Sequence, residues 1–248
     1  MPRFQGVKNW VKYILQRLLG FQNYLYVFAL FKIRTLKTDS NEKDFFHFLS
    51  LLEDGKGDVL DVGANVGIMT VHLAQKLPNT TVHAIEPLPD NLKVLKRVVE
   101  HYELKKICIH ETAVGEEAGE IEMILPTQGK TKMQGLSHVK HDTITEWNEG
   151  EEFKVHVDKI DNLINGQPVQ GIKIDVENFE YYALKGGKRI IEANHPIIYA
   201  ELWDNDNRKK CMDLLCEMDY KVNVVENNQL VPFNDKVHKG QNFIFLPN

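Results

Sequence analysis

The chain has 248 residues, of which 43% are apolar, 26% charged and 9% aromatic. This balance is typical of a soluble globular protein and excludes a disordered or fibrous chain. The length suffices for one large domain with a substantial core and does not require a second domain. Because Cys108, Cys211 and Cys216 lack disulfide or zinc-knuckle spacing, we expect reduced, buried thiols in a cytoplasmic protein.

The N-terminal segment carries a charge opposite to that of the rest of the chain. Residues 1–38 contain seven Lys or Arg and no Asp or Glu, so subtracting their charge from the net −5 leaves −12 on the rest. Apolar residues between positions 7 and 19 recur at helical spacing beside the basic ones. Two interpretations stay open: the helix packs on the domain as a cap, or it contacts an anionic membrane surface. The acidic remainder argues against nucleic-acid binding.

The apolar run at residues 24–31 is far shorter than the ~20 residues that cross a bilayer, and no small-residue cleavage site follows it. The sequence therefore predicts neither a transmembrane segment nor a signal peptide. We divide the chain into a basic helical extension, residues 1–54, and a main domain, residues 55–248. A helix is expected over 45–52 and ends before Gly55 and Gly57.

Strand and helix patterns then alternate along the main domain. Strands are predicted at 59–62, 80–85, 107–110, 171–176, 196–202, 221–226 and 242–246, and helices at 66–76, 89–102, 179–193 and 208–218. Residues 115–157 contain Gly119, Gly129, Gly135 and Gly150 among short alternating stretches, which indicates a β-rich insertion. The pattern predicts an α/β fold with a parallel sheet, right-handed crossovers and an antiparallel edge, its last two strands joined by a polar link over 231–240.

The turn after the first predicted strand reads Asp61-Val-Gly63-Ala64-Asn65-Val-Gly67. Open α/β sheets bind ligands at this place, where the first strand ends. Gly63 permits a tight turn and a close backbone approach, and Gly67 permits close packing where the helix begins. The free N–H groups of Gly63, Ala64 and Asn65 would receive an anionic group.

The loop and the next strand end together indicate the kind of cofactor. The spacing Gly-x-x-x-Gly lacks the third glycine of the dinucleotide pattern, which disfavours NAD and FAD. Glu86 is placed to accept hydrogen bonds from both ribose hydroxyls and would repel the 2′-phosphate of NADP. An adenosine cofactor with a small charged tail fits better, and S-adenosylmethionine is the common one. We expect its carboxylate on the loop N–H groups and its ammonium near the Asp61 carboxylate.

Five short motifs follow one another along the chain. They are Asp61-Val-Gly-Ala-Asn-Val-Gly67, Ala84-Ile-Glu-Pro87 with Asn91 and Leu95, Gly171-Ile-Lys-Ile-Asp-Val-Glu177 with Glu180, Leu184-Lys-Gly186, and Ile198-Tyr-Ala-Glu-Leu202. Over roughly residues 59–245 the chain thus resembles the FkbM family of S-adenosylmethionine-dependent methyltransferases. The resemblance implies a class I methyltransferase, Rossmann-like fold, with a mostly parallel seven-stranded sheet, an antiparallel final hairpin and helices on both faces. It also implies O-methylation of a hydroxyl. The family generally has Gly where this chain has Asn178, a residue that tolerates a left-handed backbone.

Methyl transfer is an in-line displacement in which the acceptor oxygen loses its proton. The strand at 171–176 is expected beside the first strand, which makes Asp175 and Glu177 candidates for base or orienting group near the sulfonium. Glu201 is a third candidate, and the three carboxylates could instead hold a divalent metal, although their spacing matches no established ligand pattern and no metal is predicted. His138 in the insertion is a candidate lid base, and His141 a weaker one.

The sequence therefore predicts S-adenosylmethionine-dependent O-methylation of a sugar, glycan or other small hydroxyl compound. One alternative is a non-catalytic or membrane-peripheral protein on a methyltransferase fold. Another is a nucleotide-dependent oxidoreductase or epimerase, which the missing glycine disfavours. We expect a cytoplasmic protein with membrane contact through residues 1–38 as an open alternative.

Overall fold

The structure of the chain is a computed structural model that describes residues 2–129, 131–140 and 147–248, with side chains from residue 10 onward. Its centre is an eight-stranded sheet in the order β12-β11-β13-β10-β9-β1-β2-β3. The strands are β1 (Asp58–Val62), β2 (Val82–Ile85), β3 (Ile107–His110), β9 (Val169–Ile174), β10 (Ile197–Glu201), β11 (Tyr220–Glu226), β12 (Gln229–Pro232) and β13 (Asn242–Pro247). The five strands from β10 to β3 pair in parallel, and β13, β11 and β12 form an antiparallel edge.

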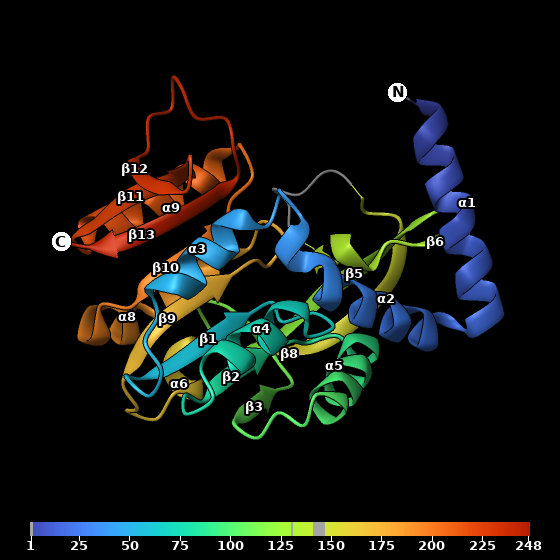
Figure 1. The fold of residues 1–248 in the computed structure, drawn as a ribbon, viewed down its shortest axis with the longest axis horizontal. Helices are drawn as coiled ribbons and strands as arrows, with labels where there is room; N and C mark the ends of the chain where they lie inside the picture. The colour runs from blue at the N-terminus through green and yellow to red at the C-terminus, as the bar shows by residue number, and fades with distance from the viewer. Residues whose placement is uncertain (1, 130, 141–146) are drawn as a thin grey trace.

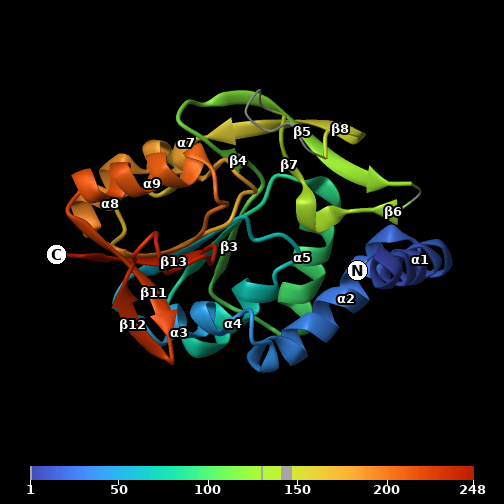
Figure 2. The ribbon, with the colours of Figure 1, turned by 90° about the horizontal axis from the view of Figure 1, so that it is seen from above.

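Helices cover both faces of this sheet (Figures 1 and 2). One face carries α3 (Lys43–Leu51), α4 (Ile68–Lys76) and α5 (Pro89–His101), and the other carries α6 (Ile160–Leu163), α7 (Glu180–Gly186), α8 (Lys188–Asn194) and α9 (Asp206–Glu217). Side chains alternate between the two layers, so Leu60 and Ile198 enter one core while their neighbours Val59 and Tyr199 enter the other. Buried strands of this kind bring their carboxyl ends to one edge of the sheet.

The arrangement confirms the predicted α/β alternation and the place of β9 beside β1. The sheet has eight strands instead of seven, because the backbone turns at Asn227 and Asn228, both with positive φ, and Gln229–Pro232 pairs with β11. The link predicted over 231–240 therefore begins inside a strand. The single helix predicted over 179–193 is two helices, α7 and α8, which meet at Gly187.

The segment predicted to be β-rich forms a second sheet, in the order β4-β8-β5-β6 with β7 paired to β5. Its elements are β4 (Ala113–Val114), β5 (Gly119–Gln128), β6 (Thr131–Lys132), β7 (His138–Val139), β8 (Gly150–Asp158) and the short 3₁₀ helix η2 (Gln134–Leu136). It lies beside the carboxyl ends of the parallel strands (Figure 2). A backbone contact joins the layers, since a Cβ added at Gly186 would lie 2.0 Å from the Gly115 oxygen.

Two N-terminal helices, α1 (Pro2–Leu19) and α2 (Phe21–Thr35), precede a short 3₁₀ helix, η1 (Leu36–Thr38). Helix α2 packs on α4 and α5 through four buried side chains, Tyr24, Leu25, Ala29 and Ile33. Helix α1 lies at the outer edge of the molecule (Figures 1 and 2), where Gln16 exchanges two hydrogen bonds with the Lys132 backbone. Helix α2 therefore packs on the main domain, as the cap interpretation of the N-terminal segment expected. Among the described helices, none combines the length and apolar character that a membrane span needs.

The cysteines only partly match their prediction. All three thiols are free. Cys211 is buried, but Cys108 is half-buried and Cys216 is exposed. The expectation of three buried thiols was therefore wrong for Cys216, which lies on the outer side of α9.

Candidate cofactor and acceptor site

A cavity lies at the carboxyl ends of β1, β2 and β9, beside the second sheet. Its lining includes Gly63, Asn65, Glu86, Asp175 and Glu177. These residues come from three segments that are far apart in the sequence, and each was predicted as a site residue. The structure therefore brings the predicted cofactor loop and the predicted catalytic carboxylates to one place.

The loop touches the end of β9 through its backbone. Gly63 has a φ of +78°, and a Cβ added there would lie 1.9 Å from the Asp175 carbonyl oxygen. The Asp175 N–H donates to the Val62 carbonyl at 3.1 Å. Only glycine fits this approach, as the sequence predicted. Gly67 has a φ of +86°, and an added Cβ would lie 2.7 Å from Leu95 Cδ1, so it lets α4 begin close against α5.

Asp61 is completely buried and acts through other side chains. Its carboxylate accepts a hydrogen bond from the Thr70 hydroxyl at 2.6 Å and pairs with Lys173 Nζ at 3.3 Å. Lys173 in turn donates to the Gly63 carbonyl at 2.8 Å. Burial acts to lower the pKa of Lys173, but the charges of Asp61 and Asp175 outweigh it and raise that pKa. The place beside Asp61 where we expected the ammonium of the cofactor is thus taken by the ammonium of Lys173.

This placement corrects the contact predicted for Asp61. Its carboxylate is absent from the cavity lining, so it does not meet a cofactor there directly. It holds Lys173, and Lys173 holds the loop carbonyl. Ala64 and Gly67 likewise lie behind the lining, where Ala64 packs in a small apolar cluster with Leu92 and Leu95.

The loop N–H groups that we expected to be free are not. Those of Gly63 and Ala64 donate to the Ile85 carbonyl at 3.1 and 3.0 Å, and that of Asn65 donates to the Glu86 carboxylate at 2.9 Å. The expectation that they receive an anionic group was therefore wrong.

Glu86 is buried and lines the cavity at the end of β2. Its carboxylate accepts hydrogen bonds from the N–H groups of Asn65 and Leu88, each at 2.9 Å, and from Asn91 Nδ2 at 3.0 Å. Burial raises the pKa of Glu86. A carboxylate has about four acceptor positions. Three are filled by the chain, which leaves about one for a ribose hydroxyl, where the sequence predicted bonds to two.

The charges of four carboxyl groups influence one another near the end of β9: Asp175, Glu177, Glu180 and Glu201. Burial and the neighbouring charge of Asp175 raise the pKa of Glu177 to about 9. Burial raises the pKa of Glu180 to about 7. Burial followed by the Asp175 charge raises that of Glu201 to about 7. Glu177 is therefore a neutral acid at neutral pH, held beside the negative charge of Asp175.

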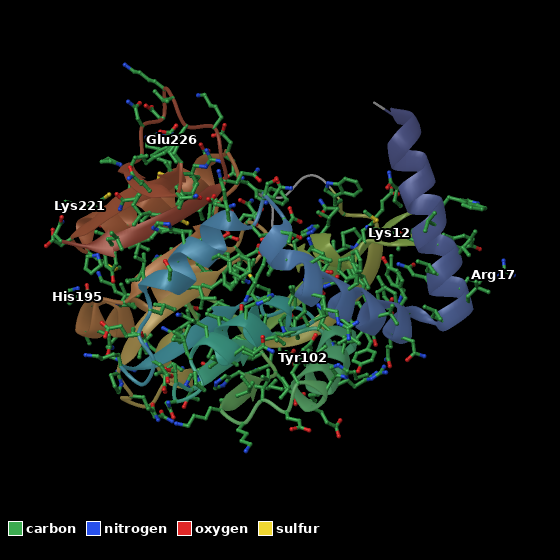
Figure 3. The ribbon with its side chains drawn as sticks, in the orientation of Figure 1. Lys12, Arg17, Tyr102, His195, Lys221 and Glu226 are labelled. Atoms are coloured by element: carbon green, nitrogen blue, oxygen red, sulfur yellow. The ribbon has the colours of Figure 1, made fainter. Side chains whose placement is uncertain are left out.

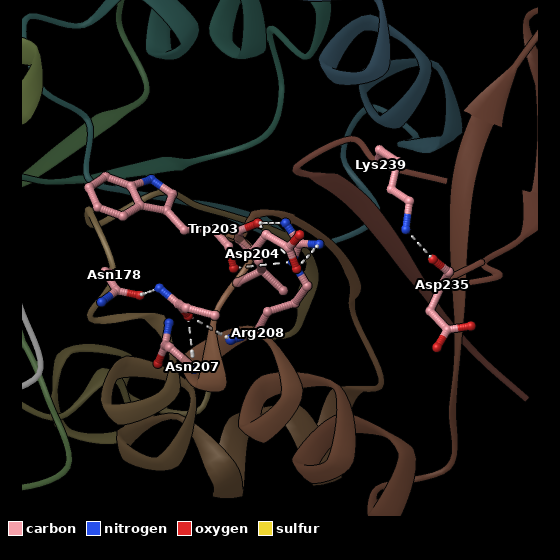
Figure 4. Close-up of polar contacts among 9 residues, drawn as sticks. Asn178, Trp203, Asp204, Asn207, Arg208, Asp235 and Lys239 are labelled. Atoms are coloured by element: carbon pink, nitrogen blue, oxygen red, sulfur yellow. Dashed lines mark hydrogen bonds and ion pairs between the residues drawn. The ribbon is translucent and has the colours of Figure 1, made fainter. Parts of the chain in front are cut away.

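The turn that presents Glu177 is held by hydrogen bonds to Glu180. Glu180 Oε1 accepts hydrogen bonds from the N–H groups of Val176 and Asn178, both at 3.0 Å. Glu180 Oε2 accepts one from Asn207 Nδ2 at 2.8 Å. Asn178 has a φ of +74°, which confirms that asparagine can take this left-handed position. Its side-chain oxygen accepts from Asn205 Nδ2 at 2.8 Å (Figure 4), so the turn is tied to the loop after β10.

Glu201 lies at the end of β10, in a neighbouring polar groove. The groove has a volume of about 490 Å³ and is lined by residues 40–44, Glu201, Gln241 and Asn242. The loop beyond β10 is fixed by Arg208, which donates to the Leu202 and Trp203 carbonyls and pairs with Asp204 (Figure 4). In the part of the chain that the structure describes, Asp175, Glu177 and Glu201 do not gather closely enough to share one metal ion.

The lid base predicted at His138 does not match the structure. His138 is buried on β7, with Nδ1 bonded to the Leu136 carbonyl at 2.9 Å and Nε2 to Asn148 Oδ1 at 3.1 Å. Its neighbours Ser137 and Val139 line the cavity, whereas His138 does not. Alternation along the strand turns the imidazole away. His141 lies outside the described residues.

Two residues of the site escaped the sequence analysis. Lys173 was not singled out within its motif, although a lone lysine within a buried apolar strand signals a buried acid. Gln134 of η2 lines the cavity and donates a hydrogen bond to the Asn65 side chain, which ties the second sheet to the cofactor loop. No sequence pattern marks Gln134, because the contact depends on how the insertion folds back.

The raised pKa of Glu177 predicts a pH-dependent stability. Between its ordinary value of 4.5 and about 9, the folded chain holds a proton that the unfolded chain has lost, so this group's contribution falls as pH rises through that range. The side chain of glutamine does not titrate, so the Glu177→Gln variant does not lose this stability as the pH rises. Each unit of pKa difference between the folded and unfolded states corresponds to about 1.4 kcal/mol of unfolding free energy. We therefore expect the Tm of Glu177→Gln to exceed that of the parent by roughly 2 °C or more near pH 8.

The difference should vanish well below pH 4.5, where both folded and unfolded states hold the proton. Thermal melts across this pH range measure it. The matched control is Glu192→Gln, an exposed glutamate of α8, which should leave the pH dependence unchanged. A Glu177→Gln variant that melts at or below the parent temperature near pH 8 would contradict the account.

The parallel strand order, the antiparallel edge and a glycine turn beside a cavity at the strand ends together define a class I methyltransferase fold. Solved structures agree. A methyltransferase FkbM from Methylobacillus flagellatus KT superposes with a TM-score of 0.54 and 18% identity, over 97% of this chain and 59% of that one. An rRNA methylase from Streptococcus thermophilus superposes with a TM-score of 0.50 and 11% identity, over 82% of this chain and 93% of that one. At these identities the likeness shows the fold alone.

The chain belongs to the methyltransferase FkbM domain family, whose model matches residues 61–222. It is also 24% identical over 142 residues to Methyltransferase 1 of Beauveria bassiana, over 52% of this chain and 57% of that protein. The chain thus spans less than two thirds of the length of that protein and of the Methylobacillus structure. The cofactor of the family is S-adenosylmethionine, and the glycine-only loop contact and Glu86 in the cavity fit it.

Proposed function

We propose that this chain transfers a methyl group from S-adenosylmethionine to a hydroxyl of a sugar, glycan or other small polar acceptor. The observation that carries the proposal is the meeting of Asp175 and the cofactor loop in one cavity, with Gly63 in backbone contact with Asp175. In this position the Asp175 carboxylate is within reach of an acceptor hydroxyl that reacts beside the cofactor loop. Hydroxyl methylation needs such a base, because the oxygen must lose its proton as it attacks.

The two carboxyl groups beside the loop divide the chemistry between them. The cofactor supplies an electrophilic methyl group on a sulfonium. Burial and the neighbouring charge of Asp175 raise the pKa of Glu177, so Asp175 is the carboxylate of the pair that accepts the acceptor's hydroxyl proton. Glu177 stays protonated and donates a hydrogen bond that orients the acceptor oxygen. Lys173 holds both Asp61 and the loop carbonyl of Gly63, which keeps the base and the loop in register.

The polar groove next to the cavity supports a polyhydroxylated acceptor. Its lining is made mainly of carboxylate, amide and hydroxyl groups, among them Glu42, Asp44 and Glu201. Such groups pair with the several hydroxyls of a sugar better than with an apolar compound. The same acidic lining opposes nucleic acid, whose phosphates it would repel.

A methylation panel tests the proposal. The chain is incubated with S-adenosylmethionine labelled in its methyl group and with sugars, glycans, phenols, amines and thiols, and the labelled products are identified by mass spectrometry. We expect ether products on hydroxyl acceptors. Labelling of amines or thiols alone would contradict hydroxyl methylation, and tight cofactor binding without any product would favour the non-catalytic alternative. Membership in a methyltransferase family removes the support for the oxidoreductase alternative.

We further propose that α1 rests on an anionic membrane surface. Five of its apolar side chains are exposed: Trp10, Val11, Leu15, Leu18 and Leu19. Phe31 of α2 is also 62% exposed. Basic side chains accompany them, with Arg17 on the outer side of the helix and Lys12 facing the body (Figure 3). Apolar side chains beside cations suit the boundary between lipid tails and anionic headgroups.

Vesicle binding measures this contact. Leu18 is 76% exposed, and burying a leucine in lipid contributes about 1.5–3 kcal/mol. The variant Trp10→Ser with Leu18→Ser should therefore sediment with phosphatidylserine vesicles at least about tenfold more weakly than the parent. Val237→Ser, which alters a 63% exposed valine elsewhere, serves as control. Equal sedimentation of all three proteins would refute membrane contact.

A further inference from the structure

A cluster of nitrogen and sulfur groups lies on the sheet outside the cofactor cavity. His83 of β2 pairs opposite Cys108 of β3, and His110 follows on the same face of β3. The candidate ligand atoms of these three residues all lie within 4.8 Å of one another. His83 Nδ1 and His110 Nε2 are 2.9 Å apart. Two adjacent strands thus aim two imidazoles and one thiol at the same small space.

Asp58 of β1 orients this cluster from the other side. Its Oδ2 lies 3.1 Å from His83 Nε2, and both side chains are largely buried. Donation from Nε2 to this carboxylate leaves the lone pair of His83 Nδ1 directed toward His110. A histidine that binds a metal through one nitrogen almost always donates its other N–H to a carboxylate or carbonyl in this way. Asp58 therefore supplies the supporting contact that such a ligand needs.

We propose that His83 Nδ1, His110 Nε2 and Cys108 Sγ form a binding site for Zn²⁺, supported by Asp58. Zinc favours tetrahedral sites built from imidazole and thiolate, with ligand nitrogens about 3.3 Å apart and nitrogen and sulfur about 3.6 Å apart. The present nitrogen separation of 2.9 Å is about 0.4 Å shorter than that value. The fourth position faces solvent, because β3 ends the sheet and Cys108 and His110 are half-buried.

Proton balance is straightforward at this site. As the metal–sulfur bond forms, the Cys108 thiol gives one proton to solvent. The hydrogen bond between the two imidazoles breaks, and His110 then carries its ring proton on Nδ1. One proton is released for each ion bound.

The position suggests what the ion would do. It would join β2 to the outermost parallel strand, β3, just before Thr112 and Ala113, which line the cofactor cavity. Binding to the folded chain alone stabilises it by mass action. The ion would therefore hold the edge of the cofactor site without entering it. The inference does not depend on the proposed acceptor or on turnover.

Cobalt titration of the full chain tests the site, since Co²⁺ takes the place of Zn²⁺ and a thiolate bound to it absorbs in the near ultraviolet. We expect one equivalent of Co²⁺ to produce this band, Zn²⁺ to displace it, and Zn²⁺ to raise the Tm. Cys108→Ser should abolish the band and His110→Gln should weaken binding at least about tenfold. Asp58→Asn should weaken it roughly 10–100-fold through the loss of its support.

The controls are Cys216→Ser and His156→Gln, an exposed cysteine and an exposed histidine elsewhere, which should bind like the parent. A second measurement needs no altered ligand: in Cys216→Ser, Zn²⁺ should slow the alkylation of Cys108. Absence of the cobalt band in the parent, or a band that survives in Cys108→Ser, would overturn the proposal. So would alkylation of Cys108 at one rate with and without Zn²⁺.

Discussion

Replacing Asp175 with asparagine is expected to lower kcat by a factor of roughly 10²–10⁴, the usual contribution of a general base. Asparagine keeps the shape of the side chain but cannot accept the hydroxyl proton. The Asp175 backbone, which touches the Gly63 loop, is unchanged, so the cofactor Kd should stay within about threefold of the parent. Steady-state kinetics with an acceptor from the methylation panel, together with calorimetric titration of S-adenosylhomocysteine, measures both quantities.

Two further variants sharpen this test. Glu177→Gln mimics the protonated carboxyl that the structure assigns to Glu177 and should keep much of the activity. Asp213→Asn removes an exposed carboxylate of α9 and should have no effect. Full activity of Asp175→Asn would remove Asp175 from the mechanism. A loss in Glu177→Gln as large as that in Asp175→Asn would contradict the division of roles between the two groups.

Gly63→Ala is expected to abolish measurable binding of S-adenosylmethionine, with a Kd at least about a hundredfold higher. The added Cβ would lie 1.9 Å from the Asp175 carbonyl oxygen, and neither backbone can remain in place. Alanine also disfavours the φ of +78° that Gly63 adopts, at a cost of about 1–2 kcal/mol. The loop must therefore move away from the end of β9, which separates the cofactor from Asp175.

Gly166→Ala separates the two causes of this effect. Gly166 has a φ of +79°, nearly that of Gly63, but nothing lies within 4 Å of an added Cβ. In thermal melts Gly166→Ala should lose only the stability that alanine costs at a positive φ, and it should bind the cofactor like the parent. If Gly63→Ala instead bound the cofactor as well as Gly166→Ala does, the close contact between loop and β9 would have no role in binding.

The strand ends were predictable because each carries its own local signal. The buried apolar run of β1 is followed by glycines, and the strands that end at Glu86 and Asp175 show the same buried pattern, so their carboxyl ends had to meet. The role of Asp61 was not predictable in this way. Its partner Lys173 pairs with it across two strands, and only the register between β1 and β9 places them together.

The failure at His138 has a similar cause. Strand β7 is short, and its register against β5, with His138 opposite Ile124, decides which face the imidazole takes. A slip of one residue would have turned it toward the cavity. The eighth strand depended on Asn227 and Asn228, whose consecutive positive φ angles form a hairpin turn. Asparagine permits that turn but does not require it, so the local pattern alone could not predict β12.

The most direct test of the account is a structure of this chain with S-adenosylhomocysteine bound. The account predicts the adenosine ribose against Glu86 and the sulfur facing the Asp175 carboxylate at the mouth of the polar groove. Placement of the sulfur toward His138, or of the cofactor away from Glu86 and the loop, would contradict it.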